Sequence, residues 1–191
     1  MILLILIHVN DSGTDVPTNN NDKLYLISYD LLNDNISNFN GEFSIKFTWE
    51  TDTYTSGYNE WINGNVTSFT NINFLFRIAQ FGSFIMFDTH PSSNRILAYW
   101  NITSEETIIG KHDYIFLYDG NGQTFELYID NVKCTNNSSN TVWITSYNGV
   151  MTDTTGYYIT AGGGFFDGAG GQPNSTSGNN KIYYFEYLNS I

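Results

Sequence analysis

The sequence predicts an all-β protein, built as an antiparallel two-sheet jelly-roll sandwich. Segments of strand length recur along the whole chain, and each is either alternating in polarity or continuously apolar. Turn-forming Gly, Asn, Asp and Pro residues separate them, and no helical pattern of ten residues or more interrupts them. Because sandwiches of this size commonly fold as one unit, we expect residues 1–191 to form a single domain.

The clearest local structure is a hairpin within residues 111–135. Residues 114–119 are a continuous apolar run, and residues 125–130 alternate, with Phe125, Leu127 and Ile129 on one face. The Asp-Gly-Asn-Gly segment at 119–122 accepts positive φ at little cost, so the chain is expected to reverse there. A second turn is expected at Asp130-Asn131.

The remaining strands are predicted in chain order. An apolar run at 2–9 is too short to span a bilayer and is expected to be a buried first strand, followed by a loop at 10–23. The cleanest alternation puts Phe43, Ile45, Phe47 and Trp49 on one face of a strand at 42–49. Further strands are predicted at 24–31, 72–79, 84–88, 95–101, 142–147, 157–161 and 181–190. Those between 72 and 101 should form a meander within one sheet.

Two segments are predicted to be long loops. Residues 51–64 carry Tyr54, Tyr58 and Trp61 among polar residues, an arrangement typical of sugar binding, because a ring stacks on a pyranose while amides and carboxylates bond its hydroxyls. The alternative for Trp61 is that it caps one end of the core. Residues 162–180 are glycine-rich around Phe165-Phe166, and they form either a ligand contact or a plain connection.

The hairpin contains a recurring set of residues, which are His112, Phe116, Tyr118, Asp119, Gly120, Leu127, Tyr128, Ile129 and Asp130. In these residues it resembles the hairpin of the laminin G-like and concanavalin A-like lectin/glucanase superfamily. Asp113 and Asn131 depart from the superfamily pattern, although Asn still tolerates the turn conformation. Residues 41–50 and the closing strand resemble its first and last strands. The resemblance implies a concanavalin A-like jelly roll, a fold that carries lectins, adhesion modules, glycoside hydrolases and structural domains.

Charge and composition restrict the classes of binding partner that are expected for this chain. The chain has a net charge of -12 and a sequence pI near 4.3, so a phosphate backbone or an anionic membrane would be repelled, and neither nucleic acid binding nor membrane insertion is expected. Few charged residues and many aromatic, Asn, Ser and Thr residues suit a module that is extracellular or on a virion surface. A single cysteine, Cys134, excludes an internal disulfide.

Catalysis is not predicted. Related hydrolases place three acidic residues along one strand, so that a nucleophile and an acid/base lie close together. Here Glu50 and Asp52 supply the first two acids, but Tyr54 and Thr55 stand where the second Glu should fall. Without that proton donor a retaining mechanism is not expected. Glycoside hydrolysis is kept as the last of the alternatives.

The sequence therefore predicts a non-catalytic, lectin-like module that binds carbohydrate or a glycosylated surface through its rim loops. The alternative is a structural, decoration or fibre protein of a virus or phage particle, which uses the same fold to assemble with itself or with other subunits. The predicted ligand-binding residues are Tyr58, Trp61, Asn63, Trp100 and Phe166, with Asp88 and Asp167 as further polar partners. Calcium is a candidate cofactor, as the resemblance suggests, and its predicted ligands are Asp88, Asp153 and Asp167.

Overall fold

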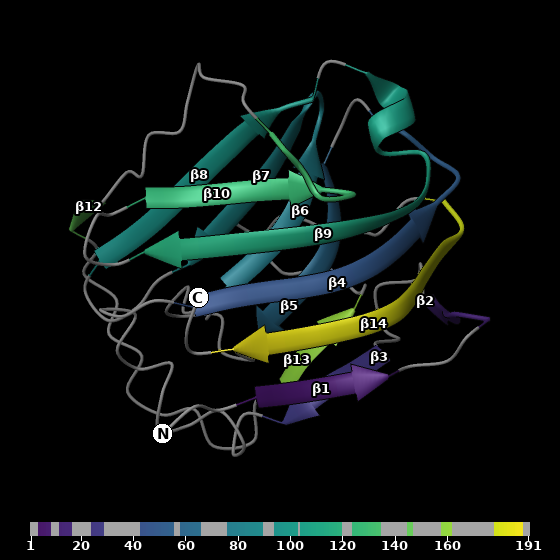
Figure 1. Ribbon diagram of the computed structural model, residues 1–191, viewed down its shortest axis with the longest axis horizontal. Coiled ribbons are helices and arrows are strands. Elements are labelled where there is room, and N and C mark those ends of the chain that lie inside the picture. The colour runs from purple at the N-terminus through teal and green to yellow at the C-terminus, as the bar shows by residue number, and fades with distance from the viewer. Residues whose placement is uncertain are drawn as a thin grey trace, which may run out of the picture.

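The computed structural model is a sandwich of two seven-stranded antiparallel sheets (Figure 1). The structure describes residues 4–8, 12–16, 24–28, 43–55, 58–65, 76–89, 94–102, 104–119, 124–134, 145–146, 158–161 and 178–188. These residues contain a single short 3₁₀ turn, η2 (Glu105–Thr107), and no α-helix. The predicted fold class is confirmed.

The first sheet joins the two ends of the chain. Its strands are, in order, β1 (Leu4–His8), β14 (Asn180–Leu188), β4 (Phe43–Thr51), β9 (Gly110–Asp119), β10 (Thr124–Ile129) and β11 (Val132–Lys133). A further strand, β2 (Thr14–Val16), pairs with the beginning of β14 on the same side as β1. The sequence assigned these three residues to a loop. They form a strand because β14 extends beyond β1 and leaves backbone groups that β2 can pair with.

The second sheet contains the predicted meander. Its order is β12 (Thr145–Ser146), β8 (Asn94–Asn101), β7 (Phe84–Thr89), β6 (Phe76–Phe81), β5 (Tyr58–Asn65), β13 (Tyr158–Ala161) and β3 (Leu24–Ser28). Strands β6, β7 and β8 are sequential neighbours, as expected. In the first sheet, β9 and β10 form the predicted hairpin, with Asp119 opposite Thr124 and Tyr114 opposite Ile129.

Aromatic side chains fill the space between the sheets. The inward residues of β4 that the alternation predicted are all at most 2% exposed, and those of β10 at most 4%. Rings from the two sheets meet directly: Phe87 of β7 lies edge-on to Phe125 of β10 with centroids 4.6 Å apart, and Trp49 of β4 stacks on Trp61 of β5 at 5.9 Å. Such contacts fix how one sheet lies on the other.

The prediction of a loop at 51–64 is wrong for its second half, which is β5. A register shift between Glu60 and Ile62 places both Trp61 and Ile62 in the core at 0% exposure. A bulge of this kind breaks the two-residue alternation by which a strand is recognised. Tyr54, in the first half of the segment, does lie outside the strands and packs partly buried against the core.

Trp61 and Trp100 are therefore not exposed binding residues, and this part of the predicted site is wrong. Trp100 is also 0% exposed and lies against Phe116 and Phe125, with ring centroids 5.5 and 5.2 Å away. Burying an indole in the sandwich removes a large apolar area from water, which favours the core over the rim. The alternative considered for Trp61, a place at the end of the core, agrees with its contacts. In the described part of the chain, no helix is long and apolar enough to cross a membrane.

Candidate functional site

A bulge in the last strand brings two neighbouring tyrosines to the same side of the first sheet. Ile182 pairs with Trp49 and Tyr184 with Thr48, so Tyr183 is an extra residue in β14. Ile182 and Phe185 are buried at 0%, whereas Tyr183 and Tyr184 between them are only partly buried. Both tyrosines therefore lie on the outer face, which a regular strand would not allow.

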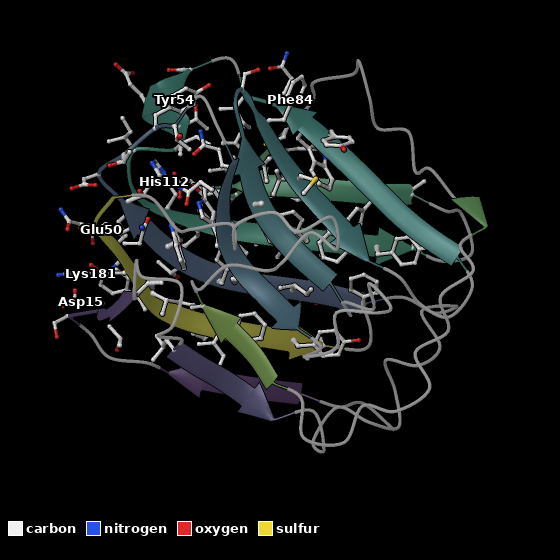
Figure 2. All side chains as sticks on the ribbon, turned by 180° about the vertical axis from the view of Figure 1, so that it is seen from behind. Asp15, Glu50, Tyr54, Phe84, His112 and Lys181 are labelled. Atoms are coloured by element: carbon white, nitrogen blue, oxygen red, sulfur yellow. The ribbon has the colours of Figure 1, made fainter. Side chains whose placement is uncertain are left out.

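The outer face also carries a row of alternating charge. Strand register places Lys111 of β9 opposite Glu50 of β4, Glu50 opposite Lys181 of β14, and Lys181 opposite Asp15 of β2. Figure 2 shows Glu50, Lys181 and Asp15 following one another along one end of the sandwich. Neighbouring strands are about 4.8 Å apart, so each charge has an opposite charge on the next strand.

Tyr183 lies within this row, and neighbouring groups cover its aromatic ring. Its hydroxyl donates a hydrogen bond to Glu50, and the Lys111 ammonium lies 3.6 Å from the ring centroid, a cation–π contact. Gly13, with φ +74°, approaches so closely that a Cβ there would stand 2.7 Å from the Tyr183 Cζ atom. The bond to Glu50, together with burial, raises the pKa of Tyr183 to about 12, so the phenol remains a donor.

Tyr184 forms a second unit of the same composition. Its hydroxyl donates to Glu186, and the Lys46 Nζ atom lies 5.7 Å from its ring centroid. Burial and the bond to Glu186 raise the pKa of Tyr184 well above its usual value. Lys46 and Glu186 are opposite each other on β4 and β14.

Tyr128 of β10 forms the third unit, near the edge of the sheet. Its hydroxyl donates to Glu126 at 2.8 Å, and Lys133 of β11 makes an ion pair with the same carboxylate. The bonds from Lys133 and Tyr128 lower the pKa of Glu126, and the bond to Glu126 raises the pKa values of both Tyr128 and Lys133. At neutral pH Glu126 is therefore ionised, Tyr128 is a neutral phenol and Lys133 is positively charged.

We call the surface formed by these three Lys–Tyr–Glu units the tyrosine face. Tyr183 is covered by Lys111 and Gly13, so the ring surface available to a ligand comes from Tyr128 and Tyr184, which are both partly buried. Strands β10 and β14 are separated by β9 and β4, which sets these two tyrosines about 14 Å apart across the sheet. The face thus combines two aromatic surfaces with carboxylate acceptors and ammonium donors. Its members are Lys46, Lys111, Lys133, Tyr128, Tyr183, Tyr184, Glu50, Glu126 and Glu186.

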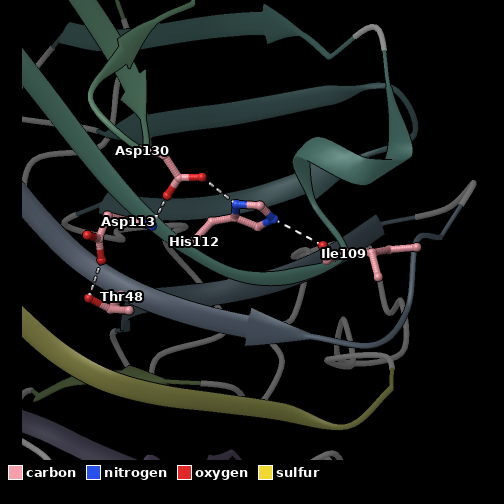
Figure 3. A network of polar contacts seen from close by, with 5 residues as sticks. All are labelled: Thr48, Ile109, His112, Asp113 and Asp130. Atoms are coloured by element: carbon pink, nitrogen blue, oxygen red, sulfur yellow. Dashed lines mark hydrogen bonds and ion pairs between the residues drawn. The ribbon is translucent and has the colours of Figure 1, made fainter.

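A polar network stabilises the turn beside this face (Figure 3). Asp130 and Asn131 have φ of 51° and 64°, the type I′ combination that joins β10 to β11. The Asp130 carboxylate accepts hydrogen bonds from the Asp113 backbone N–H at 2.9 Å and from His112 Nδ1 at 2.7 Å. His112 Nε2 donates to the Ile109 carbonyl oxygen at 3.0 Å. Both ring nitrogens of His112 therefore face oxygen atoms that accept hydrogen bonds.

This network forms a structural clamp between two strands and a turn. His112 lies with both ring nitrogens occupied, and Thr48 Oγ1 donates to Asp113 at 2.6 Å on the neighbouring strand. The clamp ties the turn at Asp130 to the beginning of β9, next to the Tyr128 unit.

Replacing Asp130 with asparagine is expected to make the free energy of unfolding less dependent on pH in the acid range. Burial acts to raise the pKa of Asp130, but the bonds from Asp113 and His112 outweigh it and lower that pKa. A lowered folded-state pKa contributes stability that is present above about pH 3.9 and is lost as pH falls through the folded value. Asparagine keeps the positive φ but not the charge, so we expect a loss of about 1 kcal/mol at pH 7 for this half-exposed group.

Urea unfolding of both proteins between pH 7 and pH 2 checks this prediction. The two free energies of unfolding should converge in acid, because the wild type loses the same contribution there. A gap that stays constant over the whole range would show that the Asp130 charge is not the cause.

The other predicted site residues are only partly placed. Tyr58 and Asn63 belong to β5 and Asp88 to β7, but their side chains are outside the described part of the chain. Phe166, Asp153 and Asp167 lie outside the described residues altogether. The predicted roles of these residues therefore stay predictions.

The described carboxylates do not fit a calcium site. Asp52 accepts bonds from Thr53 Oγ1 at 2.7 Å and from the backbone and side chain of Asn179 at 2.9 and 2.6 Å. Asp130 is occupied in the same way by Asp113 and His112. Among the described residues, no three His, Cys, Asp or Glu side chains are grouped as a metal would require.

Comparison with known proteins finds solved structures with a similar fold but no match to the sequence. No protein-family model matches the chain, and no curated protein matches its sequence. The carbohydrate-binding module of Ruminococcus gnavus IT-sialidase, CBM40, is 11% identical with a TM-score of 0.54, and the match covers 99% of this chain and 92% of that one. The same module bound to α2,3 sialyllactose matches at 10% identity and a TM-score of 0.50, covering 97% and 90%.

Two of the matches are to longer proteins, of which this chain spans only a part. Botulinum neurotoxin type C, whose cell entry is described as dependent on two ganglioside molecules, is 12% identical with a TM-score of 0.54, covering 100% of this chain and 43% of that one. The chain spans 21% of the length of the Trypanosoma rangeli sialidase chain that it matches. At these identities the likeness establishes the fold, a β-sandwich.

Sequence reasoning missed most of the tyrosine face. Tyr128 entered only as part of the hairpin pattern, and Tyr183 and Tyr184 were assigned to a last strand without a role. The signal was the Tyr-Tyr pair itself, because two large polar aromatics in succession suit a bulge better than a strand that is buried on one face.

Proposed function

We propose that this chain is a non-catalytic carbohydrate-binding module with a concanavalin A-like sandwich, and that it binds sugar on the tyrosine face. The observation that carries the proposal is the pairing of partly exposed rings with charged partners at Tyr128 and Tyr184. The flat ring packs on the apolar face of a pyranose, and the neighbouring Glu and Lys groups accept from and donate to its hydroxyls.

The fold comparison supports this proposal independently. The Ruminococcus gnavus module matches over 92% of its own length and 99% of this chain, and this shared fold supports a binding module. That module is known in complex with sialyllactose, and the neurotoxin is described as interacting with gangliosides. Sugar binding on a sandwich of this shape is therefore the first function to test.

The acidic residues support a non-catalytic role. Glu50 accepts from Tyr183, and Asp52 is held by Thr53 and Asn179. The bond from Thr53, followed by those from Asn179, lowers the pKa of Asp52. An Asp52 carboxylate that remains ionised cannot donate a proton to a leaving group, so it does not supply the acid that glycoside hydrolysis needs.

The setting that we propose is outside the cell or on the surface of a particle. A structural or decoration role in a virus or phage remains the alternative, in which the same sandwich serves assembly. The two functions separate by experiment, because an assembly subunit forms a stable oligomer without glycan affinity, whereas a binding module retains sugar binding as a monomer.

A broad glycan array, probed with the purified chain in calcium and then in chelator, tests the proposal. We expect micromolar binding in both conditions, since the tyrosine face needs no metal. Loss of binding in chelator would instead favour a calcium site at the predicted Asp88, Asp153 and Asp167. Absence of binding in both conditions, together with a stable oligomer in sedimentation, would contradict carbohydrate binding and favour assembly.

A further inference from the structure

We infer that the tyrosine face takes a neutral, hydroxyl-rich glycan in preference to a sialylated or otherwise acidic one. This inference rests on the proposed function and names its ligand class. It depends on how the positive charges of the chain are distributed and on what each of them already contacts.

The positive groups needed to bind an acidic sugar are few. The chain has seven Lys and Arg residues against 19 acidic ones. The lysines that the structure describes, Lys46, Lys111, Lys133 and Lys181, are all in strands of the first sheet. Arg77 and Arg95 lie in β6 and β8 of the other sheet. Among the residues that the structure describes, a cation for a carboxylated sugar on this face must therefore come from these four lysines.

Each of these lysines already has an acidic neighbour. Lys133 makes an ion pair with Glu126, and the same carboxylate accepts from Tyr128. Lys46 is opposite Glu186 in the strand register. An incoming carboxylate would meet a like charge one strand away, at about 4.8 Å.

The lysines in the row of alternating charge near the end of the sandwich also lie opposite acidic residues. Lys111 is opposite Glu50 and covers the Tyr183 ring, and Lys181 lies between Glu50 and Asp15. An acidic sugar could bind here only by separating existing opposite charges, while the net charge of -12 repels it at longer range. A neutral sugar avoids both costs, because its hydroxyls can donate to the carboxylates and accept from the ammonium groups without displacing them.

Matched pairs of glycans, each with and without terminal sialic acid, test the inference. The probe is the full chain in a direct binding measurement, on a sialylated glycoprotein before and after enzymatic removal of its sialic acid. We expect at least tenfold tighter binding to the desialylated form at 0.15 M salt. Binding that is lost on desialylation would overturn the ligand class but keep carbohydrate binding. Binding to neither form, nor to any other neutral glycan, would overturn the proposed function and this inference together.

A charge variant makes the cause testable. Glu126→Gln leaves Lys133 without its carboxylate partner, so it should improve binding to the sialylated form severalfold relative to the neutral form. Glu106→Gln on η2 changes the net charge equally at an exposed position of another element, and it should leave that ratio unchanged. Equal ratios for the two variants and the wild type would contradict pairing of the lysines as the basis of selectivity.

Discussion

Replacing Trp61 with alanine is expected to lower the free energy of unfolding by about 3–5 kcal/mol. The indole is 0% exposed. It contacts rings from two strands of the opposite sheet, with its centroid 5.9 Å from that of Trp49 on β4 and 5.1 Å from that of Tyr114 on β9. Truncation leaves a cavity between the sheets that close packing elsewhere prevents from collapsing. Thermal and urea unfolding, each followed by tryptophan fluorescence, measure the loss.

Trp61→Phe is the matched control. It keeps a ring against Trp49 and removes an indole N–H that has no hydrogen-bond acceptor among the described residues, so it should cost much less than the alanine change. Wild-type stability of Trp61→Ala, with only ligand binding affected, would contradict the burial of this residue and restore an exposed role for it.

Replacing both Tyr128 and Tyr184 with alanine is expected to weaken glycan binding at least tenfold, which is about 1.4 kcal/mol. These rings supply the available aromatic surface of the tyrosine face, and neither belongs to the buried core. Stacking area is lost while the packing between the sheets remains. Isothermal titration with the best ligand from the array, beside unfolding curves, separates the two effects.

Two further variants show whether the ring or the fold is responsible. Phenylalanine at both positions keeps the rings and should retain most of the affinity, with a smaller loss from the missing bonds to Glu126 and Glu186. Tyr183→Ala should reduce stability more than affinity, because that ring contacts Lys111 and lies close to Gly13. Unchanged affinity of the double alanine variant would exclude this face as the binding surface.

The architecture could be predicted because it depends on local alternation and turn chemistry. The strands predicted at 42–49 and 125–130 bury their alternate residues as the sequence indicated, and Asp130-Asn131 forms the expected turn. The apolar run at 114–119 pairs with the second of these strands as the expected hairpin, although only its alternate residues are buried. These features are encoded within a few residues of each other, and no long-range contact is needed to recognise them.

The binding surface could not be predicted because it depends on two bulges and on strand order. The bulge in β5 buries Trp61 and Ile62 together, and the bulge in β14 exposes Tyr183 and Tyr184 together. Both reverse what strict alternation gives for these positions. The sequence also could not show that Glu50, Lys111 and Lys181 meet, since their strands are neighbours only in the folded sheet.

The aromatic residues of the sequence did not identify the candidate binding site correctly, and the reason is physical. Large rings suit a sugar-binding surface and a sandwich core equally well, and the tryptophans that the structure describes, Trp49, Trp61 and Trp100, are all buried in the core. Tyr128, Tyr183 and Tyr184 differ from these tryptophans because their hydroxyls lie on the outer face, where they bond to Glu126, Glu50 and Glu186. Other tyrosines, such as Tyr114, are themselves buried in the core.

Backbone amide chemical shifts during titration with a neutral glycan test the central claim most directly. The account predicts that shifts concentrate on β10, β4 and β14, at the strand positions of Tyr128, Lys46 and Tyr184, and that the meander β6 to β8 changes little. Shifts confined to the second sheet would contradict the tyrosine face as the site. The absence of any shift with glycans that the array had identified would contradict carbohydrate binding itself.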